Sequence, residues 1–208
     1  ALTYICTSGC TGPDPQGVAH LDRAGTMSLP MVITALPSAG SGPWGNVTLD
    51  GGPYGLTWGR DNRLYVGNVT TTGDLVRADL DTGDTVEIHR FDARILATAT
   101  FDPSSLLVAL DGGRIVQASV DLSARADFAD VGEDVTSLVR DPFTGRVYVA
   151  LASGSILELD ADGTVRGTFA AVGTAVRIAY VADGYVYALD PGYPPPGAIN
   201  RYALPAAR

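Results

Sequence analysis

A repeat of about forty residues constrains this chain more than any other feature of its sequence. Four segments share one order of short apolar runs and turns. The equivalent central positions are Tyr65, Leu107, Tyr148 and Tyr187, which are 42, 41 and 39 residues apart. A fixed period of this length is typical of repeat architectures, in which each unit buries its apolar faces only by stacking on its neighbours.

Each repeat holds several short strands. Runs of four to six apolar or alternating residues are separated by turns, and Asp61, Asp102, Asp141 and Asp183 occupy the same turn in the four units. This pattern predicts antiparallel strands joined by tight hairpins, and four strands per repeat predict the blade of a β-propeller. The chain has three Glu and no Lys, so good helix formers are scarce and an all-β fold is favoured.

The 208 residues divide into five units of about 42 residues each. We predict one β-propeller domain over residues 1–208, five-bladed, with four-stranded antiparallel blades. The units cover about 1–36, 55–90, 95–130, 135–170 and 175–205, and 37–54 is an insertion. The first unit shows no first strand and the last no fourth strand, so end strands that complete one another's blade would close the ring. Four blades with an extension, or part of a larger propeller, are open alternatives.

Charge and cysteine content narrow the partners and the compartment. A net charge of −9 argues against nucleic acid and anionic membrane surfaces as partners. No apolar run approaches 18 residues, so we expect no membrane insertion. Cys6 and Cys10 lie close together around Gly9, and we expect a small disulfide between them. A disulfide favours a secreted or extracytoplasmic setting, and the start at Ala1 fits a trimmed chain.

Two stretches resemble known propeller repeats. Residues 53–56 and 60–68 resemble the blade signature of NHL, streptogramin-lyase and SMP-30-like (gluconolactonase-like) propellers, and residues 141–149 resemble the related YncE-type repeat. The resemblance covers about 150 residues, from Pro53 to Tyr202. It implies the propeller fold, which carries enzymes and binding proteins alike, so it does not assign an activity.

Three long loops predict a binding site on one face of the propeller. The loops at 7–17 and 190–197 and the connection at 37–53 are longer than the repeat requires, and a closed ring would bring them together. The candidate binding residues are Trp44, Asn46, Tyr54, Asn68, Asp111, Ser153, Asp190 and Tyr193. Prolines stiffen the backbone beside Trp44 and Tyr193, which suits stacking on a sugar ring or anchoring a peptide. Packing within the loops and ordinary turn formation are the alternative interpretations.

The sequence predicts no catalytic residue. His20 aligns with Arg77, Gln117 and Glu158 at a third-strand position that is polar in every unit, which we interpret as facing solvent. The resemblance to a streptogramin lyase implies a catalytic histidine on the ligand face, and neither His20 nor His89 falls there. A gluconolactonase-like site needs Glu, Asn and Asp around a divalent cation, and the three glutamates do not fit this requirement.

These observations favour a non-catalytic binding module that is secreted or extracytoplasmic and that recognises a protein or glycan. The alternatives are a metal-dependent small-molecule hydrolase or lyase and a self-assembling structural propeller, which would form oligomers. We predict no cofactor. If a cation binds, the acidic connection at 128–135, together with Asp92, would suit calcium through hard oxygen ligands.

Overall fold

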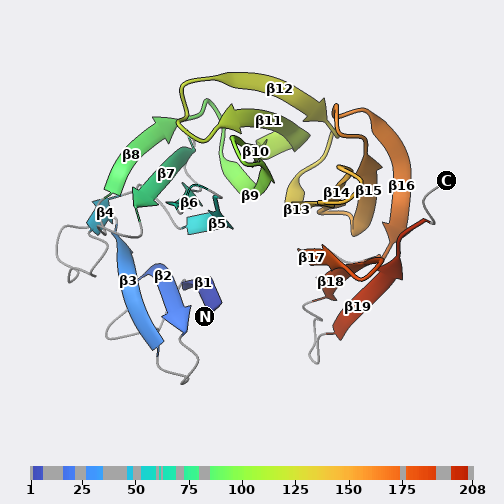
Figure 1. The fold of residues 1–208 in the computed structure, drawn as a ribbon, viewed down its shortest axis with the longest axis horizontal. Coiled ribbons are helices and arrows are strands. Elements are labelled where there is room, and N and C mark those ends of the chain that lie inside the picture. Colours follow the sequence, from blue (N-terminus) through green and yellow to red (C-terminus); the bar gives the residue numbers. More distant parts are fainter. Residues whose placement is uncertain are drawn as a thin grey trace. The chain divides into compact units, whose positions relative to one another are not determined.

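A computed structural model describes most of the chain (Figure 1). The described residues are 2–6, 16–21, 27–34, 46–48, 53–59, 61, 63–68, 73–79, 85–173, 177–190 and 198–205. The chain divides into two compact units, residues 1–98 and 99–208. In the described part, no helix is long and apolar enough to span a membrane.

The first unit contains two four-stranded sheets. One sheet has the order β1 (Leu2–Cys6), β2 (Gln16–Leu21), β3 (Met27–Thr34) and β4 (Asn46–Thr48). The other has the order β5 (Pro53–Trp58), β6 (Arg63–Asn68), β7 (Asp74–Asp79) and β8 (Thr85–Arg90). Strand β4 lies within the predicted insertion and pairs with β3 in parallel, so this sheet departs from the antiparallel prediction.

The other three sheets of the described residues belong to the second unit, except for the start of β9, because the boundary between the units falls within that strand. One sheet holds β9 (Ile95–Asp102), β10 (Ser105–Leu110), β11 (Arg114–Ser119) and β12 (Arg125–Asp130), with the short 3-10 helix η1 (Asp111–Gly113) after β10. The next holds β13 (Val135–Arg140), β14 (Val147–Leu151), β15 (Ser155–Leu159) and β16 (Val165–Ala171). The last holds β17 (Arg177–Ala182), β18 (Tyr185–Asp190) and β19 (Ala198–Ala203).

The sheets confirm the predicted all-β propeller fold with four-stranded blades. Each predicted unit corresponds to one sheet of the described residues, but only four of these sheets have four strands. The prediction of five four-stranded blades therefore holds for four of them. The three strands of the last sheet agree with the absence of a fourth strand in the final repeat.

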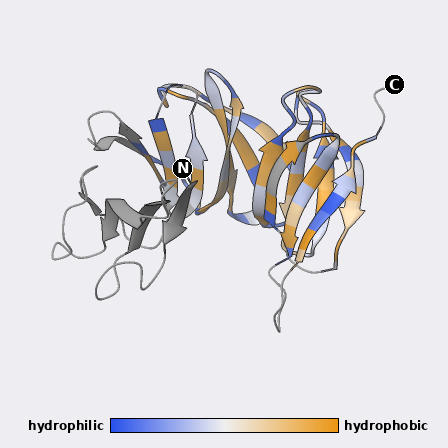
Figure 2. Ribbon diagram, turned by 60° about the horizontal axis from the view of Figure 1, so that its bottom comes forward, coloured by the Kyte–Doolittle hydropathy of each residue, from blue (hydrophilic) through white to orange (hydrophobic). Residues whose placement is uncertain are grey.

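The predicted core residues are buried. All of the following are at most 5% exposed: Tyr65, Val66, Val76, Val108, Ile115, Leu138, Val149, Ile156 and Val186. Every residue of β10 and of β14 is buried, because second strands are covered on both faces, and most residues of β12 and β16 are exposed or half-buried. Figure 2 shows apolar bands recurring along the strands of the second unit. Burial of one such aliphatic side chain contributes about 1.5–3 kcal/mol.

Neighbouring sheets of the second unit pack through a mixed aliphatic and aromatic interface. Tyr148 belongs to the same buried cluster as Ile178 and Val186 of the last sheet. The ring of Phe169 on β16 contacts Tyr202 on β19 edge-on, with 6.4 Å between ring centroids. The backbone N–H of Ile178 also donates a hydrogen bond to Ser137 Oγ at 2.6 Å. Apolar packing and a side-chain hydrogen bond thus join these two sheets.

The interpretation of the third-strand polar position as facing solvent is wrong at Arg77, which is only 7% exposed. Arg77 lies opposite Tyr65 in the strand register, and the Tyr65 hydroxyl donates a hydrogen bond to Asp61 Oδ2 at 2.8 Å. Burial, followed by the hydrogen bond to Asp61 and its charge, raises the pKa of Tyr65 well above its ordinary value. The hydroxyl therefore stays protonated and remains a donor within a buried polar group.

Glu158, which occupies the same third-strand position in the sheet β13–β16, has a charged partner. Glu158 lies opposite Tyr148 and forms an ion pair with Arg146, with 2.5 Å between Oε1 and Nη1. Burial, followed by the negative charge of Glu158, raises the pKa of Tyr148 to about 12. The polar third-strand side chains Arg77 and Glu158 are thus at least partly buried, and Glu158 is held by an ion pair. The side chain of His20, at the aligned position, lies outside the described residues.

The repeated aspartates shape the turn between the first and second strands. Asp102 Oδ1 accepts hydrogen bonds from the backbone N–H and the hydroxyl of Ser104, at 2.7 and 2.8 Å. Asp141 Oδ1 accepts one from the backbone N–H of Phe143 at 2.9 Å. Asp183 acts differently, since its own φ of 51° places it in the left-handed region. Aspartate suits both tasks because its short side chain bonds to nearby backbone and tolerates that region.

Acid should lower the unfolding free energy through the carboxylate of Asp121, which lies in another turn. Hydrogen bonds from the Ser119 hydroxyl and then from Ser123 lower the pKa of Asp121 to about 2 from an ordinary value of 3.8. A carboxyl with a lowered folded-state pKa stabilises the protein above its unfolded pKa, and this stabilisation disappears as pH falls from about 4 to about 2. Urea unfolding at pH 5 and pH 2.5 should show a smaller acid-dependent loss in Asp121→Asn than in the wild type.

The matched control is Asp127→Asn, at an exposed position on the neighbouring strand β12. It should keep the wild-type dependence of the unfolding free energy on pH. An unchanged acid loss in Asp121→Asn would show that the Asp121 turn does not contribute to acid stability.

Candidate functional site

The predicted binding residues fall partly outside the described part of the chain. Trp44, Tyr193 and Cys10 lie outside the described residues, and only the backbone is described for Cys6, Asn46, Tyr54 and Asn68. In the first unit, Asn68 pairs with Pro53 in the register of β5 and β6, so Tyr54 and Asn68 lie at the same end of this strand pair. The disulfide between Cys6 and Cys10 stays a prediction.

In the second unit, three predicted residues occupy equivalent places in consecutive sheets. Asp111 begins η1 directly after β10, Ser153 lies in the turn after β14, and Asp190 is the last residue of β18. The repeat therefore places these residues at the second-strand ends, as the sequence predicts. Ser153 is exposed, whereas Asp111 and Asp190 are half-buried.

Two carboxylates of the connection between β12 and β13 bind the loops that contain Asp111 and Ser153. The backbone N–H of Gly112 donates to Asp134 Oδ1 at 2.8 Å. The backbone N–H of Ser153 donates to Glu133 Oε1. One short acidic segment thus holds the second-to-third strand loops of two adjoining sheets. We call residues 111–113, 130–134 and 152–154 the clamp face.

The backbone of the clamp face is also hydrogen-bonded. One bond recurs in both units, from the residue after a fourth strand to the glycine that precedes the third strand of the same sheet. The donor and acceptor pairs are Phe91 N to Gly73 O at 2.8 Å, Val131 N to Gly113 O at 3.0 Å, and Val172 N to Gly154 O at 2.9 Å. Ala152 N adds a bond to Asp134 O at 2.9 Å. The loop positions are therefore set by backbone geometry.

Glycine is required at one position of this face by space as well as by conformation. Gly113 has φ of 94°, and a Cβ there would lie 2.5 Å from the backbone nitrogen of Glu133. The neighbouring Gly112 has φ of 79°, but a Cβ there would meet no atom within 4 Å. The chain of Gly113 thus approaches the acidic connection more closely than any side chain permits.

Three carboxylates of the clamp face hold its backbone in place. Those of Glu133, Asp134 and Asp130 each accept a hydrogen bond from a backbone N–H, and the bond from Gly132 N to Asp130 Oδ1 is 2.9 Å long. Within the described ranges, no group of three or more His, Cys, Asp or Glu side chains is placed to hold a metal ion. These bonds hold the loops of the clamp face in one arrangement, with Gly112, Gly132, Ala152 and Ser153 exposed on it.

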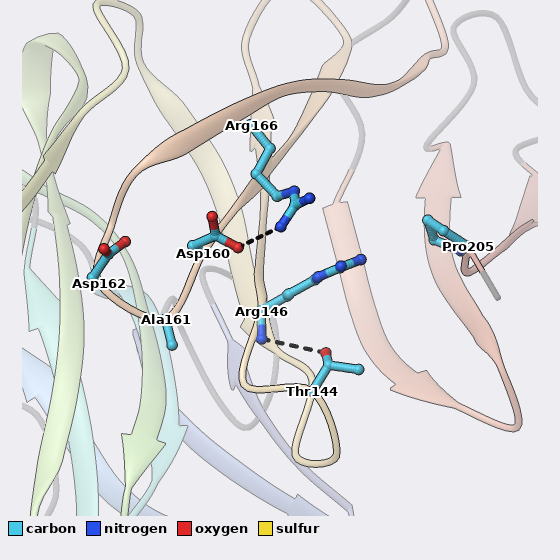
Figure 3. A pocket seen from close by; sticks show the side chains of 7 residues that line it. All are labelled: Thr144, Arg146, Asp160, Ala161, Asp162, Arg166 and Pro205. Carbon is cyan, nitrogen blue, oxygen red and sulfur yellow. Dashed lines mark hydrogen bonds and ion pairs between the residues drawn. The ribbon is translucent and has the colours of Figure 1, made fainter. Parts of the chain in front are cut away.

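A second candidate site, which the sequence did not indicate, lies at the other end of β14–β16. It is a pocket of about 540 Å³ lined by Thr144, Arg146, Asp160, Ala161, Asp162, Arg166 and Pro205 (Figure 3). Figure 3 shows the side chains of Arg146 and Arg166 extending into the space that faces Pro205. The sequence predicted these segments only as strands and hairpin turns. The sequence feature that could have drawn attention to this end of the sheet was Phe143, an aromatic residue in a turn of Asp, Pro, Thr and Gly.

Comparison with known proteins identifies the fold. No protein-family model and no curated protein matches the sequence. The chain is similar to the computationally designed Ika4 protein, with a TM-score of 0.57 and 14% identity over 76% of this chain and 94% of that one. It is similar to a chain of the nidogen/laminin complex, with a TM-score of 0.61 and 12% identity over 84% and 64% of the two chains.

The chain is also similar to virginiamycin B lyase from Staphylococcus aureus, with a TM-score of 0.57 and 10% identity over 88% of this chain and 61% of that one. It therefore spans less than two thirds of this lyase and of the nidogen/laminin chain. At such identities the similarity shows the β-propeller fold, which agrees with the predicted resemblance to propeller repeats and assigns no activity.

The clamp face makes a direct stability prediction. Gly113→Ala and Gly112→Ala both place a Cβ on a left-handed backbone, which costs about 1–2 kcal/mol. Only Gly113→Ala also collides with the backbone of Glu133, so its unfolding free energy should fall by a further 2 kcal/mol or so, the range for strained or overpacked sites. Chemical denaturation of the two variants measures the difference. Equal losses would contradict the close approach at Gly113.

Proposed function

We propose that this chain is a non-catalytic binding module of a secreted or extracytoplasmic protein, and that the clamp face binds a partner protein. The observation that carries the proposal is the pair of bonds from Gly112 and Ser153 to Asp134 and Glu133, which holds the loops of two sheets in one arrangement. A surface that is ordered before binding loses less conformational entropy in the complex. The secreted setting is supported by the sequence of Cys6 and Cys10 alone.

The chemistry of the face supports a protein ligand. Its exposed residues include Gly112, Gly132, Ala152 and Ser153, whose side chains are small and let a partner approach the ordered loops closely. Asp130 adds an exposed carboxylate, and the chain carries a net charge of −9. A complementary partner would offer basic side chains, because complementary charge speeds association and sets orientation. The similar chain in the nidogen/laminin complex belongs to a complex of two proteins, which supports a protein partner for this propeller.

The carboxylates at both candidate sites favour binding over catalysis. General acid or base catalysis needs a group that is placed to exchange a proton with a substrate. Glu133 and Asp134 instead accept backbone hydrogen bonds, and Asp160 and Glu158 form ion pairs with arginines. Among the described side chains, the one histidine is His89 on β8, in the first unit. A hydrolase or lyase function remains the alternative proposal.

A surface substitution tests the protein-binding role. Ser153→Arg places a large cation at the centre of the clamp face, where the side chain is exposed and the essential bond is made by the backbone. Affinity purification with mass spectrometry, followed by titration with the purified partner, should show at least a tenfold loss of affinity. Ala124→Arg is the control, because Ala124 is exposed in the turn at the opposite end of β11 and β12.

If Ser153→Arg and Ala124→Arg bind the partner with equal affinity, the proposal is contradicted. Capture of a glycan instead of a protein, blocked by Ser153→Arg, would assign the face to glycan recognition.

Chelation tests the enzymatic alternative. A metal-dependent hydrolase or lyase holds its cation in the folded state, so removing the cation lowers the melting temperature by mass action. We expect no stoichiometric metal in protein purified without chelator and the same melting temperature with and without EDTA. Bound metal in a 1:1 ratio, with a lower melting temperature in EDTA, would favour the enzymatic alternative over the proposed function.

A further inference from the structure

We propose that the pocket between the β15–β16 hairpin and Pro205 binds a neutral saccharide. The pocket lies within the second unit, at the end of β14–β16 away from the clamp face. Its volume of about 540 Å³ falls within the range of about 300–1,000 Å³ that is usual for sites of small ligands. The inference concerns a different face from the proposed protein site and stands independently of it.

The pocket offers hydrogen-bond donors and acceptors side by side. Arg166 Nη1 lies 2.8 Å from Asp160 Oδ1, and the two side chains are 46% and 40% exposed. A guanidinium has five N–H donors and a carboxylate has two oxygens, so this ion pair uses only part of each group. Arg166 and Asp160 both line the pocket, and each keeps hydrogen-bonding groups that this ion pair does not use (Figure 3).

A second arginine repeats this arrangement. Arg146 Nη1 lies 2.5 Å from Glu158 Oε1, and these side chains are 27% and 13% exposed. The ion pair holds the Arg146 guanidinium in place, and Figure 3 shows its tip extending into the pocket toward Pro205. Two guanidinium groups held by ion pairs, Arg146 just before β14 and Arg166 on β16, therefore line the same pocket.

The charges of the pocket exclude a strongly charged ligand. The positive charges of Arg146 and Arg166 are balanced by Glu158 and Asp160, and Asp162 adds another negative charge to the lining. The chain as a whole carries −9, which repels free anions at long range. A cation would in turn meet two guanidinium groups. A neutral ligand rich in hydrogen-bonding groups suits this balance.

Hydroxyl groups match the donors and acceptors of the pocket. Each hydroxyl donates one hydrogen bond and accepts others, so it can bridge an arginine N–H and an aspartate oxygen. Neighbouring hydroxyls on a sugar ring present this combination repeatedly. Hydrogen bonds to charged partners are also stronger than those between neutral groups, which helps to offset the loss of water around the sugar.

An exposed aromatic residue directly precedes the pocket lining in the sequence. Phe143 is 89% exposed and directly precedes Thr144, which lines the pocket. Its turn is held by Asp141, which is 1% exposed and accepts bonds from Phe143 N at 2.9 Å and from Thr144 Oγ1 at 2.5 Å. A phenyl ring kept exposed on a fixed turn can cover the C–H face of a saccharide.

A saccharide panel tests the inference. The probes are immobilised neutral oligosaccharides, the same chains carrying sulfate or uronic acid groups, and inorganic phosphate in solution. We expect binding to a subset of the neutral chains and at least tenfold weaker binding to the charged ones. Titration calorimetry with the best neutral chain then measures the variants. Arg166→Ala and Phe143→Ala should each weaken binding about tenfold, which corresponds to the loss of a hydrogen bond to a charged group or of an aromatic contact.

Ser153→Arg is the matched control, because it alters the clamp face and should leave saccharide affinity unchanged. Melting temperatures confirm that the variants are folded, which is expected since Arg166 and Phe143 are exposed. The inference is overturned if no neutral saccharide binds, if charged saccharides or phosphate bind more tightly, or if Arg166→Ala and Phe143→Ala bind like the wild type. Loss of partner protein in Ser153→Arg with intact saccharide binding would support both sites.

Discussion

A single backbone hydrogen bond governs the loop end of each blade in which it occurs. It joins the residue after the fourth strand to the glycine that precedes the third strand, in the pairs Phe91–Gly73, Val131–Gly113 and Val172–Gly154. The bond brings the connection to the next blade against that glycine. At Gly73 and Gly113 a Cβ would lie 2.5 Å from backbone atoms of the connection, so the approach is open only to glycine. In the second unit, the position of the clamp face depends on this contact.

The side chains at the two ends of the strands are consequently constrained to different degrees. At the loop end, side chains such as Glu133 and Asp134 are committed to holding backbone. At the hairpin end, the aspartate turns are closed locally, as at Asp102 and Asp141, and adjacent side chains are left free to differ between repeats. The polar pocket and the exposed Phe143 occur at this second end. The residues that hold the backbone at the loop end therefore differ from those that line the pocket at the hairpin end.

The repeat predicted most of the fold because strand spacing and turn chemistry are local properties. Predicted core residues such as Tyr65, Val108 and Ile156 are buried, and Asp111 and Ser153 occupy the predicted second-strand ends. The parallel strand β4 was missed because its three residues carry no periodic signal. Arg77 was assigned to solvent because alternation along a strand does not reveal a cross-strand partner. The pocket was missed for a similar reason, since Arg146, Arg166 and Pro205 meet only when strands of two sheets are stacked.

Paired charges explain how this acidic chain can present arginines to a ligand. An isolated guanidinium attracts any anion, whereas Arg166 beside Asp160 and Arg146 beside Glu158 have their charge largely neutralised at short range. Exposed ion pairs of this kind add little to stability, typically 0–1 kcal/mol, so their value to the fold is small. Their effect on recognition is larger, because a fixed donor beside a fixed acceptor selects ligands by geometry instead of by charge. Such a pocket discriminates among hydroxyl arrangements, which differ between saccharides in geometry but not in charge.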